Sequence, residues 1–260
     1  MINYSFSIYD LEYFLLILAR VSCFVFICPF FSMQNTPRRV RTALSIFISM
    51  LLYQAVTPAE AVVTGSVIEY AIVVIKESIA GLLIGFSVNI CTTVFNFAGG
   101  IADMETGLRM VTLMDPATRE QLSITGGIYN YTFSMILIAS GMYRYLLGAL
   151  ADTYELIPVN HVNFNMQGLY ETILVFLADY IMIGFRIILP IFATMMLLNA
   201  ILGVMAKVSP QMNMFAVGIQ LKVLTGLTIL FLTVGMMPAA CDMVFNEMKK
   251  MMVSFVSNMM

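Results

Sequence analysis

Charged residues are scarce in this sequence. Lys, Arg, Asp and Glu make up 11% of its 260 residues, whereas about a quarter of an ordinary soluble domain is charged. The formal net charge is −2, from 13 basic and 15 acidic residues. Binding to nucleic-acid phosphates depends on clustered Lys and Arg, and no such excess is present. The composition therefore excludes a nucleic-acid partner.

Residues that perform catalysis or hold metals are also few. The one histidine, His161, lies between Asn160 and Val162, in the turn-rich setting typical of a solvated loop. Neither an H-E-x-x-H zinc motif nor a G-x-S-x-G nucleophile elbow occurs. Cys23 and Cys28 do not have zinc-site spacing and fit the role of small buried hydrophobes. We expect no catalytic residue, no metal site and no cofactor.

Hydrophobic residues are abundant instead, at 60% of the chain, and the mean hydropathy is +0.92. A helix needs about 20 apolar residues to cross the hydrocarbon core of a membrane. The pattern predicts an all-α, polytopic membrane protein. Its six candidate spans lie near 11–31, 42–56, 67–95, 122–150, 172–206 and 211–238.

The fifth of these runs is too long for a simple crossing. About 35 residues at 1.5 Å each reach roughly 52 Å, against a hydrocarbon core of about 30 Å. Arg186 and Pro190 mark the position at which we expect a break or kink, because proline removes a helical hydrogen bond. The short sequence KVSPQMN at 207–213 predicts a tight helical hairpin between the last two spans.

The positions of Lys and Arg predict a membrane orientation. Basic residues concentrate in the 32–41, 96–121 and 207–210 connections, which we expect in the cytoplasm. Both termini and the 151–171 loop, which carries no Lys or Arg, would then face outside.

Several charged residues fall inside the apolar runs, where facing lipid is costly and usually signals function or pairing. One interpretation is that they line a proton or ion path. The other, which we favour, is that they pair with neighbouring subunits or face water within an assembly, because the sequence lacks the matched, interrupted helices of a carrier. These candidates are Arg20, Glu69, Lys76, Glu77, Arg144, Asp179, Arg186 and Lys222.

Three stretches together resemble one protein family. They are NTPRRVRTALSI at 35–46, ETGLRMVTLMDPATREQ at 105–121 and LNAILGVMAKVSPQMNMFAVGIQLKVLTGL at 198–227. Their order and spacing are similar to those of the FliR family, whose injectisome counterpart is SctT. The resemblance covers nearly the whole chain. It implies a non-enzymatic subunit of a type III secretion export gate. The flagellar system is favoured over the injectisome.

The resemblance also implies an architecture and partners. A FliP-like part would occupy 1–171, a FliQ-like helical hairpin 172–238 and a C-terminal tail 239–260, assembled with FliP and FliQ in a helical gate. FlhA, FlhB, unfolded flagellar export substrates and membrane lipid are the further partners it implies. The location would be the bacterial inner membrane at the flagellar basal body. Part of the assembly would stand above the bilayer on the periplasmic side, which a conventional crossing does not allow.

Within this family, the segment before an Asp-Pro pair plugs the closed channel. The Gly-Leu and Asp-Pro matches carry that role to Gly107–Pro116, inside a plug loop at about 99–120. A pore wide enough for an unfolded chain would leak ions, and an apolar constriction can prevent this. Methionine suits such a stopper because its side chain is adaptable. The residues implied are Gly107, Leu108, Met110, Val111, Met114, Asp115 and Pro116. A stand-alone polytopic transporter or ion channel is the alternative function.

Overall fold

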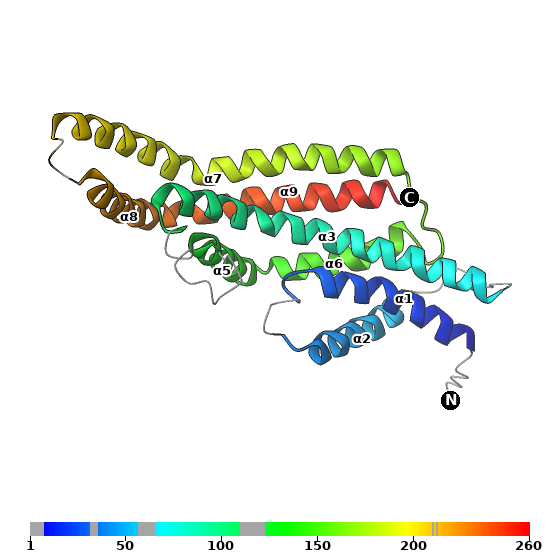
Figure 1. The fold of residues 1–260 in the computed structure, drawn as a ribbon. Coiled ribbons are helices and arrows are strands. Elements are labelled where there is room, and N and C mark those ends of the chain that lie inside the picture. Colours follow the sequence, from blue (N-terminus) through cyan, green and yellow to red (C-terminus); the bar gives the residue numbers. More distant parts are fainter. Residues whose placement is uncertain (1–7, 32–35, 57–65, 110–122, 210, 212) are drawn as a thin grey trace. The chain divides into compact units, whose positions relative to one another are not determined.

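The computed structural model describes residues 8–31, 36–56, 66–109, 123–209, 211 and 213–260, and within these ranges it is helical without strands (Figure 1). The helices are α1 (Ile8–Ile27), α2 (Arg38–Ala55), α3 (Val67–Thr106), α5 (Ile124–Ala139), α6 (Met142–Leu156), α7 (Met166–Val208), α8 (Met214–Thr233) and α9 (Met237–Ser257). A short 3-10 turn, Val234–Met236, joins α8 to α9. The segment predicted as a C-terminal tail is therefore mostly helix.

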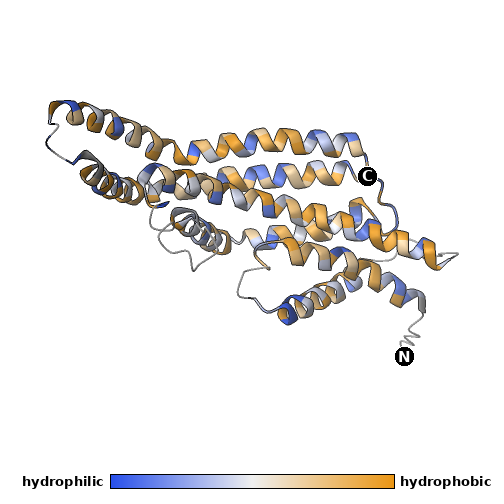
Figure 2. Ribbon diagram, viewed as in Figure 1, coloured by the Kyte–Doolittle hydropathy of each residue, from blue (hydrophilic) through white to orange (hydrophobic). Residues whose placement is uncertain are grey.

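Among the residues that the structure describes, three stretches are long and apolar enough to cross a membrane. They are Val67–Thr106, Met166–Val208 and Ala216–Ser257. A fourth is added if α5 and α6, which are separated by a break at Ser140–Gly141, count as one broken span. Hydrophobic residues run along these helices (Figure 2). The chain is thus a polytopic helical membrane protein, as its composition predicts.

The long helices exceed their expected bounds. Residues 96–106, which we expected in a connection, continue α3 to Thr106, so that prediction was wrong. At Pro190, where we expected a break or kink, the helix is not broken, because α7 is one helix of 43 residues with Pro190 inside it. Figure 1 shows α7 changing direction part-way along its length, which is how a helix usually accommodates an internal proline.

The helical hairpin expected at 207–213 is present. Helix α7 ends at Val208 and α8 begins at Met214. The Asn213 side chain caps α8 by accepting a hydrogen bond from the backbone N–H of Ala216 at 3.4 Å. A methyl group added at Gly218 of α8 would lie 3.6 Å from Cδ1 of Leu202 in α7, so the two arms are in contact.

The chain divides into two compact units. One comprises 1–91, 140–176 and 247–260, and the other comprises 92–139 and 177–246. Helices α3, α7 and α9 contribute residues to both units.

In the first unit, α1 packs closely against α3. A methyl group at Gly81 of α3 would collide with the backbone of Arg20 in α1, and one at Gly85 would meet the backbone of Phe24. Small residues four apart allow such close approach between membrane helices. Further along, the Asn89 side chain donates to the carbonyl of Ile27 at 3.0 Å. The contacts follow the same order along both helices, so α1 and α3 are parallel.

In the second unit, the end of α3 packs against α5, α7 and α8. The Phe133 ring of α5 lies 4.7 Å from that of Phe95 and 5.0 Å from that of Phe245, measured between centroids. Ala102 of α3 joins a fully buried cluster with residues of α7, namely Ile188, Ile191 and Met195. The end of α3 is therefore embedded in a packed core.

Candidate functional site: the end of α3 and the buried charges

Helix α3 ends where the predicted plug begins. Thr106 is its last residue, and Gly107 follows with φ +81°. This left-handed conformation after a helix is typical of a glycine that stops it, because residues with a Cβ adopt it only with strain. The structure places Gly107 and Leu108 at half-buried positions. The other plug candidates, Met110, Val111, Met114, Asp115 and Pro116, lie outside the described residues.

The carboxylate of Asp103, one turn before the end of α3, links that helix to the start of α5. It is 3% exposed. Its Oδ2 accepts from the hydroxyl of Ser123 at 2.7 Å, and its Oδ1 accepts from the Thr125 hydroxyl at 2.5 Å and the Thr125 backbone N–H at 3.2 Å. The Ser123 hydroxyl in turn accepts from the N–H of Gly126 at 2.8 Å, as an N-cap does. An acid at the positive end of a helix is electrostatically favourable.

Backbone contacts hold the same helices together. Gly99 of α3 and Gly126 of α5 are so close that a methyl group on Gly99 would overlap the Gly126 backbone. On another side, the fully buried Thr106 occupies the space beside Gly226 of α8. The residues flanking the 107–122 segment are thus fixed on both sides by close packing.

Sequence reasoning missed Asp103. The residue lies in the predicted 96–121 connection, where an acid is ordinary, because Gly99, Gly100 and the neighbouring acid Glu105 lower the local hydropathy. One signal was available: Ser123 directly precedes an apolar run, which is a pattern typical of a helix N-cap. That pattern locates the start of α5 but not the acid that contacts it.

Arg20 and Glu77 form an ion pair in the interior of the first unit. Both residues have no exposed surface, and the Arg20 Nε lies 2.6 Å from Oε2 of Glu77. The remaining guanidinium nitrogens donate to the carbonyl of Ile157 at 3.1 and 3.2 Å and to the carbonyl of Thr153 at 3.3 Å. The Tyr154 ring lies under the guanidinium, 4.3 Å from its carbon.

The other carboxylate oxygen of Glu77 extends this network to a turn. Oε1 accepts from the backbone N–H of Asn160 at 3.0 Å. Asn160 has φ +74°, a conformation that asparagine tolerates better than most residues. The pair therefore joins α1, α3, the end of α6 and the turn after it, using the chain's own groups alone.

The remaining charged candidates lie nearer the surface. Lys76, Asp179 and Lys222 are half-buried, whereas Glu69, Arg144 and Arg186 are exposed. Glu69 and Lys76 are seven residues apart, as are Asp179 and Arg186, and this spacing puts each pair on one face of its helix. Sequence spacing shows no more than that. It gave no sign of the contact between Arg20 and Glu77, which are 57 residues apart.

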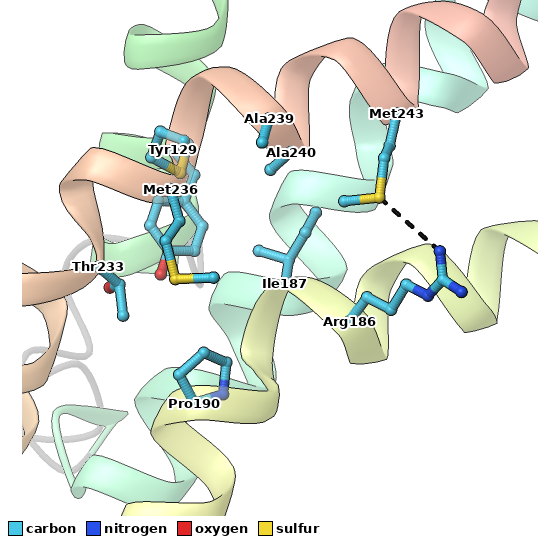
Figure 3. A pocket seen from close by; sticks show the side chains of 10 residues that line it. Tyr129, Arg186, Ile187, Pro190, Thr233, Met236, Ala239, Ala240 and Met243 are labelled. Carbon is cyan, nitrogen blue, oxygen red and sulfur yellow. Dashed lines mark hydrogen bonds between the residues drawn. The ribbon is translucent and has the colours of Figure 1, made fainter.

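Arg186 stands beside a small apolar cavity in the second unit (Figure 3). The cavity has a volume of about 80 Å³, and the side chains of Pro190, Met236 and Met243 contribute to its lining. The guanidinium Nη1 lies 3.9 Å from the sulfur of Met243, which is a weak acceptor. Within the described ranges, no carboxylate lies within ion-pair distance of Arg186.

The comparison with known proteins is decisive for the family. The family model of bacterial export proteins, family 1, matches residues 11–248. The chain belongs to this family. It is 26% identical to the flagellar biosynthetic protein FliR of Aquifex aeolicus over 242 residues, which is 92% of both chains. It is 25% identical to FliR of Bacillus subtilis, over 92% of this chain and 93% of the relative.

A relative with a different name also matches. The surface presentation of antigens protein SpaR of Shigella flexneri is 25% identical over 82% of this chain and 81% of its own length. The resemblance to the FliR family drawn from the three sequence stretches is confirmed, and the chain is a FliR-family export protein.

Proposed function

We propose that this protein is a component of the flagellar type III export apparatus in the bacterial inner membrane. The observation that carries the proposal is the family match over residues 11–248, together with FliR relatives aligned over about nine-tenths of the chain. The membrane-spanning helices support the location. FliP, FliQ, FlhA and FlhB are the partners we infer, and unfolded flagellar proteins are the cargo.

In this proposal the chain does no chemistry of its own and forms part of the wall of the passage. The FliP-like part at 1–171 and the FliQ-like hairpin at 172–238 would meet FliP and FliQ, with part of the assembly above the bilayer. The exposed apolar residues of α7 and α8 are consistent with surfaces that other helices or lipid cover. The alternative is a stand-alone transporter or ion channel.

The second part of the proposal is that Gly107–Pro116 stoppers the closed channel. It is supported by the helix stop at Gly107 and by the firm packing of residues on either side of the 107–122 segment. A stopper needs a fixed base, so that it returns to the same place after a chain has passed. It also needs a deformable tip, for which the methionines at 110 and 114 are suited.

Deletion of Gly107–Met114 tests the stopper. We expect the assembled gate to conduct ions several-fold more, because the proposed stopper is what blocks ion flow through the closed pore. The measurement is single-gate conductance, with assembly checked on the same preparation. A deletion of equal length in the 57–65 connection is the matched control. Unchanged conductance in a normally assembled gate would remove the stopper from the proposal.

We also propose that the exposed and half-buried charged candidates meet neighbouring subunits or water. Arg186 is the strongest of these, since a guanidinium beside an apolar cavity in a membrane helix is costly without an anionic partner. The Arg20–Glu77 pair is different in kind, because its groups are already satisfied within the chain.

A further inference from the structure

We propose that Asp103 is a clasp: a positioning residue that holds the two ends of the 107–122 segment together. The consequence for gating rests on the proposed stopper function, whereas the clasp itself rests on geometry alone. Asp103 lies before the segment and Ser123 and Thr125 lie after it, 20 and 22 residues further along the chain.

The Asp103 carboxylate acts only as an acceptor in this contact. Every group that reaches the Asp103 carboxylate in the described structure is a donor: two hydroxyls and one backbone N–H. Hydrogen bonds to a carboxylate are about twice as strong as those between neutral groups. The N-terminus of α5 adds a favourable dipole. An ionised aspartate is therefore satisfied here without an arginine or lysine.

The surrounding packing makes this contact possible. The glycines at 99 and 126 let the α3 and α5 backbones touch one turn further from the segment, and this close approach brings the short aspartate within reach of Ser123 and Thr125. Contacts then run in opposite order along the two helices, so α3 and α5 are antiparallel.

If the proposed stopper function holds, the clasp prevents a displacement of the 107–122 segment from spreading α3 and α5 apart. A passing polypeptide that displaces the segment would pull on the last turn of α3 and the first turn of α5. With the two ends tied to each other, the pull does not spread the helices. The end of α3 and the start of α5 then keep one separation.

The test uses the full chain with Asp103→Asn in the purified assembly. The amide side chain brings its own donors toward hydroxyls that already donate, so the contact is weakened without a change in size. We expect backbone amides at 123–127 to exchange hydrogen roughly tenfold faster or more. Ser134→Ala is the matched control, since it removes a hydroxyl of the same helix that bonds only within it.

Two further variants keep the test valid even if Asp103→Asn fails to fold. Ser123→Ala and Thr125→Val each remove one donor and should show smaller increases in exchange. Adding Thr125→Val to Asp103→Asn should add little, because groups that share one contact are not additive. Exchange at 123–127 that is unchanged in Asp103→Asn, or simple additivity of the double variant, would overturn the clasp.

Conductance of the same assemblies distinguishes this inference from the function on which it rests. If the 107–114 deletion leaks and Asp103→Asn leaks as well, Asp103 positions the stopper. If the deletion leaks and Asp103→Asn, despite faster exchange, stays tight, the positioning role is overturned. If the deletion itself stays tight, the stopper function fails, and faster exchange in Asp103→Asn still supports the clasp.

Discussion

Two buried carboxylates in this protein are satisfied by different means. Glu77 faces the guanidinium of Arg20 and a backbone N–H, whereas Asp103 faces hydroxyls and the start of a helix. The first arrangement leaves a large cost if either partner is lost, because a charge then remains in the interior. The second distributes the same task over several neutral donors.

Arg20→Met should therefore destabilise the first unit. Removing one partner of a buried ion pair costs about 3–5 kcal/mol, and here the Ile157 and Thr153 carbonyls lose their donors too. The expected result is a clear drop in the thermal midpoint of the purified assembly. Arg144→Met is the control, since that arginine is exposed and bonds to the neighbouring Tyr143. Equal midpoints for the two variants would contradict the role assigned to the pair.

At this scale the sequence predicted which charges are costly but not how they are satisfied. Arg20 and Glu77 stood out because they interrupt apolar runs. Their pairing depends on α1 lying parallel to α3, a long-range feature with no local pattern. Asp103 did not stand out, because three glycines and Glu105 give its neighbourhood the composition of a loop, although Gly99 is buried in contact with α5.

At the scale of elements, hydropathy located the helices better than their ends. The 67–95 run and the hairpin near 207–213 were found, but α3 continues to Thr106 and α7 begins at Met166. The extra turns of α3 contain the buried Asp103, whose carboxylate accepts hydrogen bonds from Ser123 and Thr125. Pro190 did not break α7, since a long helix held by its neighbours tolerates one missing hydrogen bond by bending.

Gly81→Ala tests the closest of the helix contacts. A methyl group there overlaps the Arg20 backbone, so α1 must shift away from α3. We expect a loss of roughly 1–3 kcal/mol, typical of an overpacked interior, seen as a lower thermal midpoint. Gly148→Ala in α6 is the matched control, because nothing lies within 4 Å of its added methyl group. That variant should be neutral or slightly more stable, and a reversed order would contradict the packing described.

At the scale of the whole molecule, much apolar surface of α7 and α8 is uncovered. Leu197, Val204, Leu224 and Phe231 are each more than half exposed. Sequence composition predicted the membrane class correctly. It could not predict which apolar faces meet lipid and which meet other subunits, because both environments favour the same side chains.

Arg186→Ala tests the subunit-contact proposal. If an acidic group of a neighbouring subunit pairs with Arg186, truncation leaves that group without its partner, at a cost of about 2–5 kcal/mol. We expect the recovery of intact assembly from detergent to fall by roughly tenfold or more. Lys250→Ala, which removes a surface lysine, is the control. Recovery equal to that of the control would instead favour a chain that acts alone.

The length of α7 has a consequence for the cell that makes it. Its 43 residues extend about 64 Å, roughly twice the hydrocarbon thickness of a bilayer. In a lone copy, some apolar turns of α7 would therefore lie outside the hydrocarbon core of the bilayer. Surplus copies are expected to be cleared by membrane quality control, so that the supply of companion chains, and not the rate of translation, sets how much of this one persists.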